Sequence, residues 1–266
     1  MADKKYPLGL VLSGGGTRGV AHAGFLKFMQ EQQLQPEIFA CCSAGSIVGA
    51  LYTVGKSPDE ILDFFKSVYF FHWRHFTFNK PGLVSSLIFS TYLQPVFGNR
   101  TIGDLETDLR IIATELVSGE QKVFGPNDKV VDAVIASCSI PGVTTPYLVG
   151  EEMFCDGGVL NNFPADIIHN ECERIIGVYV SPPQIVELND LNTIKAVTTR
   201  AYELLSHRTE LYKFAYCDWL VTSQELAQYG TFERKASRLE EIFNIGYEAA
   251  KASFKETIFA ANKEYK

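Results

Sequence analysis

The sequence predicts an α/β fold, a three-layer α/β/α sandwich with a mostly parallel central sheet. Short apolar runs, such as residues 8–12 and 38–42, alternate along the chain with longer segments of helical periodicity. Of the 266 residues, 46% are hydrophobic, which is sufficient for a substantial core. Strands that alternate with helices favour a parallel sheet covered on both faces. Because no low-complexity linker or internal repeat interrupts the pattern, we expect residues 1–266 to form a single domain.

The first part of the chain supplies two strands and three helices. Residues 8–12 form an apolar run that ends at glycines, and residues 38–42 form a second run. Apolar residues at helical spacing predict a helix that starts near residue 20, and residues 44–54 predict another. Residues 57–60 read Ser-Pro-Asp-Glu. A serine that can cap a helix, followed by proline and by glutamate three positions after the serine, predicts that a further helix starts here.

The rest of the chain continues the alternation after residues 67–98, an aromatic-rich segment that no single pattern describes. Strands are predicted at residues 109–116, 121–124, 174–180 and 219–222, and a hairpin at residues 147–149 and 152–155. Helices are predicted at residues 129–138 and 164–170, with a long amphipathic helix at 194–211 and a final one at 239–254.

Composition and charge limit the classes of function. A formal net charge of −7 and a pI near 5.3 argue against a broad nucleic-acid-binding surface. No uninterrupted apolar stretch approaches the roughly 18 residues of a spanning helix, and residues 1–5 do not resemble a secretion signal. We therefore expect a cytoplasmic protein without a transmembrane segment, and any contact with a membrane would be peripheral.

Cysteines and histidines do not form a metal-binding pattern. The six cysteines include no Cys-x-x-Cys pair, so neither a zinc site nor a disulfide framework is expected, and reduced, buried thiols are the preferred interpretation. His72 and His75 form an isolated His-x-x-His without a third ligand nearby. We expect no metal and no other cofactor.

A glycine-rich turn, Gly14-Gly15-Gly16-Thr17-Arg18-Gly19, lies between the first predicted strand and the first helix. It matches the dinucleotide-binding pattern Gly-x-Gly-x-x-Gly, but it also suits a loop whose free amides stabilise an oxyanion. The nucleotide interpretation requires an acidic residue near the end of the second strand, where Cys41 and Cys42 stand instead. A purely structural turn is the third interpretation.

Ser43 follows the second strand in the sequence Cys42-Ser43-Ala44-Gly45 and precedes an apolar helix. A serine on such a strand–turn–helix corner is lifted clear of the sheet, with its hydroxyl directed at a substrate. The small neighbours Ala44 and Gly45 allow the tight turn. The alternative interpretation is that Ser43 caps the helix.

Asp156-Gly157-Gly158 ends the predicted hairpin. An Asp-Gly pair after a strand is most often an ordinary turn. A carboxylate at a strand end can also lie at the edge where open α/β sheets build their sites. Since a serine nucleophile needs a base and none of the five histidines stands in a suggestive setting, Asp156 is the preferred base.

Together these segments resemble the patatin-like phospholipases, in particular the compact bacterial members. That family combines a Gly-rich oxyanion loop with a basic residue, a Gly-x-Ser-x-Gly elbow and a late Asp-Gly-Gly or Asp-Gly-Ala, which residues 14–19, 43–45 and 156–158 match in order. Further matches in sequence order are residues 113–116, 136–142 and 161–164. One position departs from the family: Cys41 stands where the elbow has its first glycine, so a side chain is added beside the following helix.

The resemblance implies a hydrolase of lipid acyl esters that uses a Ser43–Asp156 dyad and an acyl-enzyme, without a metal. Amides around Gly15 and Gly16 would bind the oxyanion, and Arg18 would hold the loop or add a positive field. The aromatic residues within 69–78 would either cap an acyl-chain groove or form a hydrophobic cluster under a loop. Two other classes stay open, a non-catalytic lipid- or acyl-binding protein on the same fold and a nucleotide-binding oxidoreductase.

Overall fold

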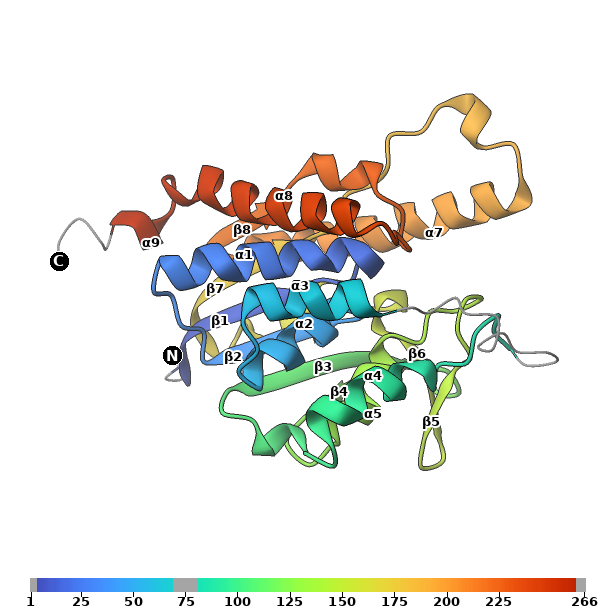
Figure 1. Ribbon diagram of the computed structural model, residues 1–266, viewed down its shortest axis with the longest axis horizontal. Coiled ribbons are helices and arrows are strands. Elements are labelled where there is room, and N and C mark those ends of the chain that lie inside the picture. Colours follow the sequence, from blue (N-terminus) through green and yellow to red (C-terminus); the bar gives the residue numbers. More distant parts are fainter. Residues whose placement is uncertain (1–3, 69–80, 262–266) are drawn as a thin grey trace.

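The computed structural model describes residues 4–68 and 81–261, and its centre is one sheet (Figure 1). Eight strands of the described residues form it: β1 (Tyr6–Leu12), β2 (Ile38–Cys42), β3 (Asp108–Glu115), β4 (Gln121–Phe124), β5 (Tyr147–Val149), β6 (Glu152–Asp156), β7 (Cys172–Tyr179) and β8 (Trp219–Thr222). Their order is β5-β6-β3-β2-β1-β7-β8, and β4 pairs with β3.

The sheet is mostly parallel, as predicted. The run β3-β2-β1-β7-β8 is parallel throughout, whereas β4 and β6 pair antiparallel with β3, and β5 pairs antiparallel with β6. Because parallel strands end at the same edge, the Gly-rich turn after β1 and Ser43 after β2 share one edge of the sheet.

Helices cover both faces of the sheet. They are α1 (Val20–Glu31), α2 (Ala44–Thr53), α3 (Pro58–Ser67), α4 (Ile88–Phe97), α5 (Val130–Ser137), α6 (Ala165–Ile168), α7 (Ile194–Glu210), α8 (Ala236–Phe254) and α9 (Ile258–Ala261). Leu10 and Leu12 of β1 join the core formed with α1, α2, α5 and α8, whereas Val11 joins a second core with α6. This alternation confirms a strand buried on both faces, and hence three layers.

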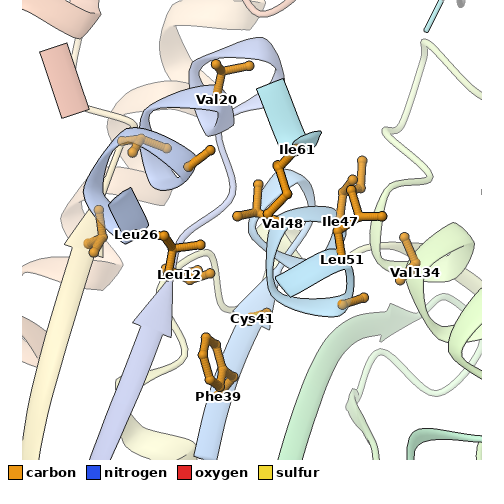
Figure 2. Packing of buried hydrophobic residues seen from close by; sticks show 14 of the residues in the cluster. Leu12, Val20, Leu26, Phe39, Cys41, Ile47, Val48, Leu51, Ile61 and Val134 are labelled. Carbon is orange, nitrogen blue, oxygen red and sulfur yellow. The ribbon is translucent and has the colours of Figure 1, made fainter. Parts of the chain in front are cut away.

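The helix that follows Ser43 is anchored by the larger core. Figure 2 shows Ile47, Val48 and Leu51 of α2 among side chains from the neighbouring strands and helices, including Phe39 of β2 and Ile61 of α3. Burial of each such side chain is worth about 1.5–3 kcal/mol. The turn that carries Ser43 is therefore held between a central strand and a firmly packed helix.

Two segments differ from the sequence-based expectations. Helix α4 lies within residues 67–98, where no helix was predicted; Pro95 falls in its last turn and the helix ends at Phe97. Helix α7 occupies the predicted long helix, but its apolar stripe is exposed rather than buried, with Ile194 at 89% and Leu204 at 48% exposure. In Figure 1 the segment that leads into α7 extends away from the layers.

Candidate active site

Ser43 occupies the turn between β2 and α2 and has a strained backbone. Its φ of 49° and ψ of −123° lie outside the regions that a residue with a side chain normally adopts. The turn is tight because a Cβ at Gly45 would lie 2.3 Å from the carbonyl oxygen of Leu12. A Cβ at Gly19 would lie 2.5 Å from that of Ala44, so the start of α1 packs against the same turn. This geometry is that of a nucleophile elbow.

The structure brings Ser43 and Asp156 together. Ser43 Oγ donates to Oδ2 of Asp156 over 2.5 Å and makes no capping bond to α2, so the interpretation of Ser43 as a helix cap is wrong. Both residues are buried, at 5% and 6% exposure. Asp156 ends β6 and lies opposite Ala113 of β3, which places it near the edge where β2 ends.

The Asp156 carboxylate is buried, and protein donors bond both of its oxygens. Its Oδ1 accepts from the amide of Gly158 at 2.7 Å and from the thiol of Cys42 at 3.9 Å. Burial raises the pKa of Asp156 to about 6, although the bonds from Ser43, Gly158 and Cys42 favour the ionised form. Gly157 lets the turn lie against β3, since a Cβ there would come within 2.4 Å of a β3 carbonyl oxygen. A carboxylate of this pKa is ionised at neutral pH and is a stronger base than usual.

Two amides of the Gly-rich loop are available to a ligand. The Gly14 amide donates to the Asn162 carbonyl at 3.0 Å, and the Gly14 carbonyl accepts from Ser181 Oγ at 2.7 Å. Among the described residues, no protein acceptor takes the amides of Gly15 and Gly16. Since the peptide plane is fixed at the Gly14 carbonyl, the Gly15 N–H points the opposite way. Free amides beside a serine hydroxyl suit the stabilisation of an oxyanion.

The loop lies directly against Ser43 and tolerates no side chain at Gly14 or Gly16. A Cβ at Gly14 would lie 3.1 Å from that of Ser43. Gly16 has a φ of +58°, and its Cβ would lie 2.4 Å from the Thr231 carbonyl oxygen. Glycine is therefore required on both sides of Gly15.

Arg18 is a support of this loop. Its guanidinium donates to the carbonyls of Gly15 at 3.3 Å and Pro182 at 3.4 Å, and to Ser181 Oγ at 3.5 Å. The residue is 9% exposed. These bonds favour the loop-holding interpretation of Arg18, because the donors are used within the protein.

Cys41 fits beside α2 because Gly49 leaves room for it. Cys41 has no positive φ, so the strand accepts a side chain there, and a Cβ at Gly49 would lie 2.6 Å from the Cys41 sulfur. The departure at Cys41 does not prevent the strained turn at Ser43.

Several supporting residues were not found from the sequence. Ser137 Oγ accepts the Ser43 amide at 2.8 Å, and the Ser139 carbonyl accepts the Asp156 amide at 2.8 Å, so the C-terminal end of α5 holds both candidate residues. Residues 136–142 were recognised as a family segment, but no spacing signal indicates these bonds.

A buried ion pair from the end of α7 also supports the site. Glu210 accepts the amides of Asn162 at 3.0 Å and Phe163 at 3.2 Å, and Lys213 pairs with it at 2.8 Å. Glu210 and Lys213 are 1% and 3% exposed. Through Asn162, this pair steadies the segment that accepts the Gly14 amide.

Two hollows of different character open at Ser43. One is mainly apolar and is lined by side chains that include Ile47, Phe65, Val84, Phe89, Val143 and Leu239. The other, called the polar hollow, is lined mainly by residues with polar side chains, which include Asp156, Tyr179, Ser181, Thr199, Tyr202 and His207. His207 was predicted only as part of a helix; nothing in its sequence setting places it near Ser43.

The remaining predicted features lie outside the site or outside the described residues. His72, His75 and the aromatic residues of 69–78 fall in the segment that the structure does not describe. Residues 4–68 and 81–261 contain no group of three or more side chains that could hold a metal ion. Within the same ranges, no helix combines the length and the hydropathy that a membrane span requires.

The fold and the elbow define an α/β protein with a serine–aspartate pair at the carboxyl edge of a parallel sheet. The chain belongs to the family of the patatin-like phospholipases, whose model matches residues 10–169. Ser43, Asp156 and the Gly-rich loop fall within this range, whereas α7 and α8 follow it.

Relatives in several organisms share part of the chain. A patatin-like phospholipase domain-containing protein of Caenorhabditis elegans is 30% identical over 181 residues, which cover 64% of this chain and 13% of that protein. The neuropathy target esterase sws of Drosophila melanogaster is 28% identical over 61% of this chain and 12% of its own length. The uncharacterized protein YqhO of Bacillus subtilis is 30% identical over 65% of this chain and 70% of its own length.

A solved structure shares the fold. The crystal structure of VipD from Legionella pneumophila matches 95% of this chain and 67% of that chain with a TM-score of 0.58. Its sequence identity of 13% limits the likeness to the architecture.

Proposed function

We propose that the protein is a serine acyl hydrolase that cleaves acyl esters of lipids, of the phospholipase A or lysophospholipase type. The observation that carries the proposal is the 2.5 Å bond from Ser43 Oγ to the buried Asp156 carboxylate, made on a strained elbow beside two free amides. Strain of this kind persists in proteins mainly where function requires it. The family and the names of the relatives support lipid esters as the substrate class.

In the first half of the reaction, Ser43 Oγ attacks the ester carbonyl carbon while Asp156 takes the hydroxyl proton. The amides of Gly15 and Gly16 bind the oxyanion of the tetrahedral intermediate. Loss of one such donor typically costs about 100- to 1,000-fold in rate. When the intermediate collapses, the bond to the leaving oxygen breaks, and Asp156 returns the proton to the departing alcohol.

In the second half, water replaces the alcohol. Asp156 takes a proton from water, the hydroxide adds to the acyl carbonyl, and the free fatty acid leaves as Ser43 regains its proton. A single carboxylate thus acts as base and acid in both halves. No other group needs to change its charge.

A panel of acyl esters tests the proposal. We expect wild type to hydrolyse lipid esters, and Ser43→Ala and Asp156→Asn to lose nearly all turnover while they remain folded. Ser237→Ala and Asp59→Asn change the same residue types at exposed positions and should keep wild-type rates. Substantial turnover in either site variant would contradict the dyad.

Two alternatives make different predictions. A non-catalytic lipid- or acyl-binding protein would bind fatty acids but would show no turnover in this panel. A nucleotide-binding oxidoreductase would bind NAD or NADP in a fluorescence titration. The acidic residue that such a site needs at the end of β2 is replaced by Cys41 and Cys42, which favours the hydrolase.

We further propose peripheral contact with lipid surfaces through the outer side of α7, and a cytoplasmic location. Ile194, Val197 and Leu205 are 89%, 51% and 66% exposed on a helix whose other side lines the polar hollow at Ser43. A lipid surface that covers these side chains would remove them from water. The six cysteines, which are all unpaired, favour a reducing compartment.

Vesicle co-sedimentation tests the contact. Ile194→Ser combined with Val197→Ser should weaken binding to phosphatidylcholine vesicles and leave hydrolysis of a water-soluble ester unchanged. Unaltered vesicle binding would contradict lipid contact through α7. A dimer that the variant disrupts would show instead that α7 contacts a second copy of the chain.

A further inference from the structure

The polar hollow at Ser43 has a definite place in the reaction if the proposed function holds. An ester carbonyl carbon carries an acyl chain on one side and the alcohol oxygen on the other. With the oxyanion at the Gly15 and Gly16 amides, these two arms must leave Ser43 in different directions. The apolar hollow suits the acyl chain, so the polar hollow is left for the alcohol.

The wall of the polar hollow is one side of α7. Thr199, Tyr202, Ser206 and His207 follow one another at steps of a helical face and all line it. Apolar residues of the same helix, such as Leu204, point elsewhere and are exposed. Tyr202 at 46% and Leu204 at 48% are exposed to a similar degree, whereas Ser206 and His207 are half-buried, so α7 forms an open wall of the hollow rather than a covered one.

The charged side chains near this wall bond other groups of the protein. Glu203 pairs with Arg200 at 2.6 Å and accepts the Gln184 amide at 2.8 Å, while Arg18 donates to oxygens of its own loop and of Ser181 and Pro182. Among the described residues that line the hollow, the charged side chains of Glu203 and Arg18 are thus each held by protein partners.

Most neutral polar groups of the wall make no hydrogen bond within the described part of the protein. No protein partner bonds the hydroxyls of Thr199, Tyr202 and Ser206 within the described part of the chain. His207 contacts the Tyr179 hydroxyl through Nδ1 at 3.1 Å, which leaves Nε2 for a ligand. Partial burial lowers the pKa of His207. Tyr202 is 46% exposed, and desolvation of its ring together with the Asp156 charge raises its pKa, so both rings are neutral near pH 7.

We propose that the polar hollow binds the leaving alcohol, that this alcohol carries free hydroxyl groups as glycerol does, and that Tyr202 and His207 select it. Neutral donors and acceptors recognise hydroxyl groups without the cost of pairing a charge. The apolar hollow receives one acyl chain, so the favoured substrates are monoacyl esters of glycerol-type alcohols. This inference rests on the proposed hydrolase function and names its substrate class.

Matched esters of one fatty acid test the proposal. The kcat/KM of wild type for the monoacylglycerol should exceed that for the methyl ester at least about tenfold, since two or more hydrogen bonds of about three- to tenfold each are gained. Tyr202→Phe and His207→Phe should each lower the monoacylglycerol value about three- to tenfold and leave the methyl ester value unchanged. Tyr212→Phe and His169→Phe, which lie outside the hollow, should alter neither.

Other outcomes would overturn the proposal. Equal kcat/KM for the methyl and glycerol esters, or equal loss on both esters in the variants, would mean that the hollow does not select the alcohol. A lysophosphatidylcholine preferred more than tenfold over the monoacylglycerol would mean that charge, and not hydroxyl groups, is recognised. If no ester is turned over, the proposed function itself fails, which is a distinct result.

Discussion

Replacement of Asp156 by asparagine should stabilise the fold while it removes the proposed base. Burial raises the pKa of Asp156 from an ordinary value of 3.8 to about 6. This shift corresponds to about 3 kcal/mol, because one pKa unit is worth about 1.4 kcal/mol. Asparagine has the same shape, and it can still accept the Gly158 amide and bond Ser43.

The pH dependence gives the sign of this effect. The folded protein holds the Asp156 proton more tightly than the unfolded chain, so wild type loses unfolding free energy as the pH rises from about 4 to about 6. Above about pH 6 both states are ionised and the loss is complete. The asparagine variant has no such proton, so its unfolding free energy does not fall in this way as the pH rises.

Urea and thermal unfolding across this pH range measure the effect. The advantage of Asp156→Asn should be small near pH 4 and grow to as much as about 3 kcal/mol by about pH 7, or about 6–12 °C in Tm. The control Asp59→Asn removes only an exposed ion pair with Lys27 and should lower stability by about 1 kcal/mol or less. A variant that is less stable than wild type at about pH 8, or an advantage that does not change with pH, would refute the reasoning.

Other features of the site give three shorter predictions. The kcat/KM should fall about tenfold per pH unit below about pH 6, because Asp156 must be ionised to act as a base; a rate that stays constant down to about pH 4 would exclude that role. Gly49→Ala should cost about 1–3 kcal/mol in urea unfolding, since its Cβ would lie 2.6 Å from the Cys41 sulfur, and adding Cys41→Gly should recover most of the loss. Ser43→Gly should be about 1 kcal/mol more stable than Ser43→Ala in the same assay because glycine accepts a φ of 49°, and equal stabilities would show that the elbow is not strained.

Much of the fold follows from local sequence patterns. The buried strands β1, β2 and β7 are short apolar runs, and the start of α3 has its capping box, so these elements were predicted to within a few residues. Helix α4 was missed because it belongs to the aromatic-rich segment 67–98, in which no single periodicity indicates a helix. For α7 the periodicity identifies the helix but not which side is covered, because coverage depends on neighbours distant in sequence.

In the candidate site, too, some features follow from local sequence patterns and others depend on tertiary packing. Ser43 and Asp156 could be paired from the sequence because each follows a predicted strand, and the strand ends meet at one edge. The compensation of Cys41 by Gly49 requires the packing of β2 against α2. The role of His207 depends on where α7 lies, which no local pattern specifies.

Covalent labelling with a fluorophosphonate tests the central claim most directly, since the reagent reacts far faster with an activated serine hydroxyl than with an ordinary one. Intact mass and peptide mapping of wild type should show one adduct, located on Ser43. Asp156→Asn should label far more slowly, and Ser43→Ala should not label. A wild-type chain that stays unmodified, or an adduct at another serine, would contradict the assignment of Ser43 as the nucleophile.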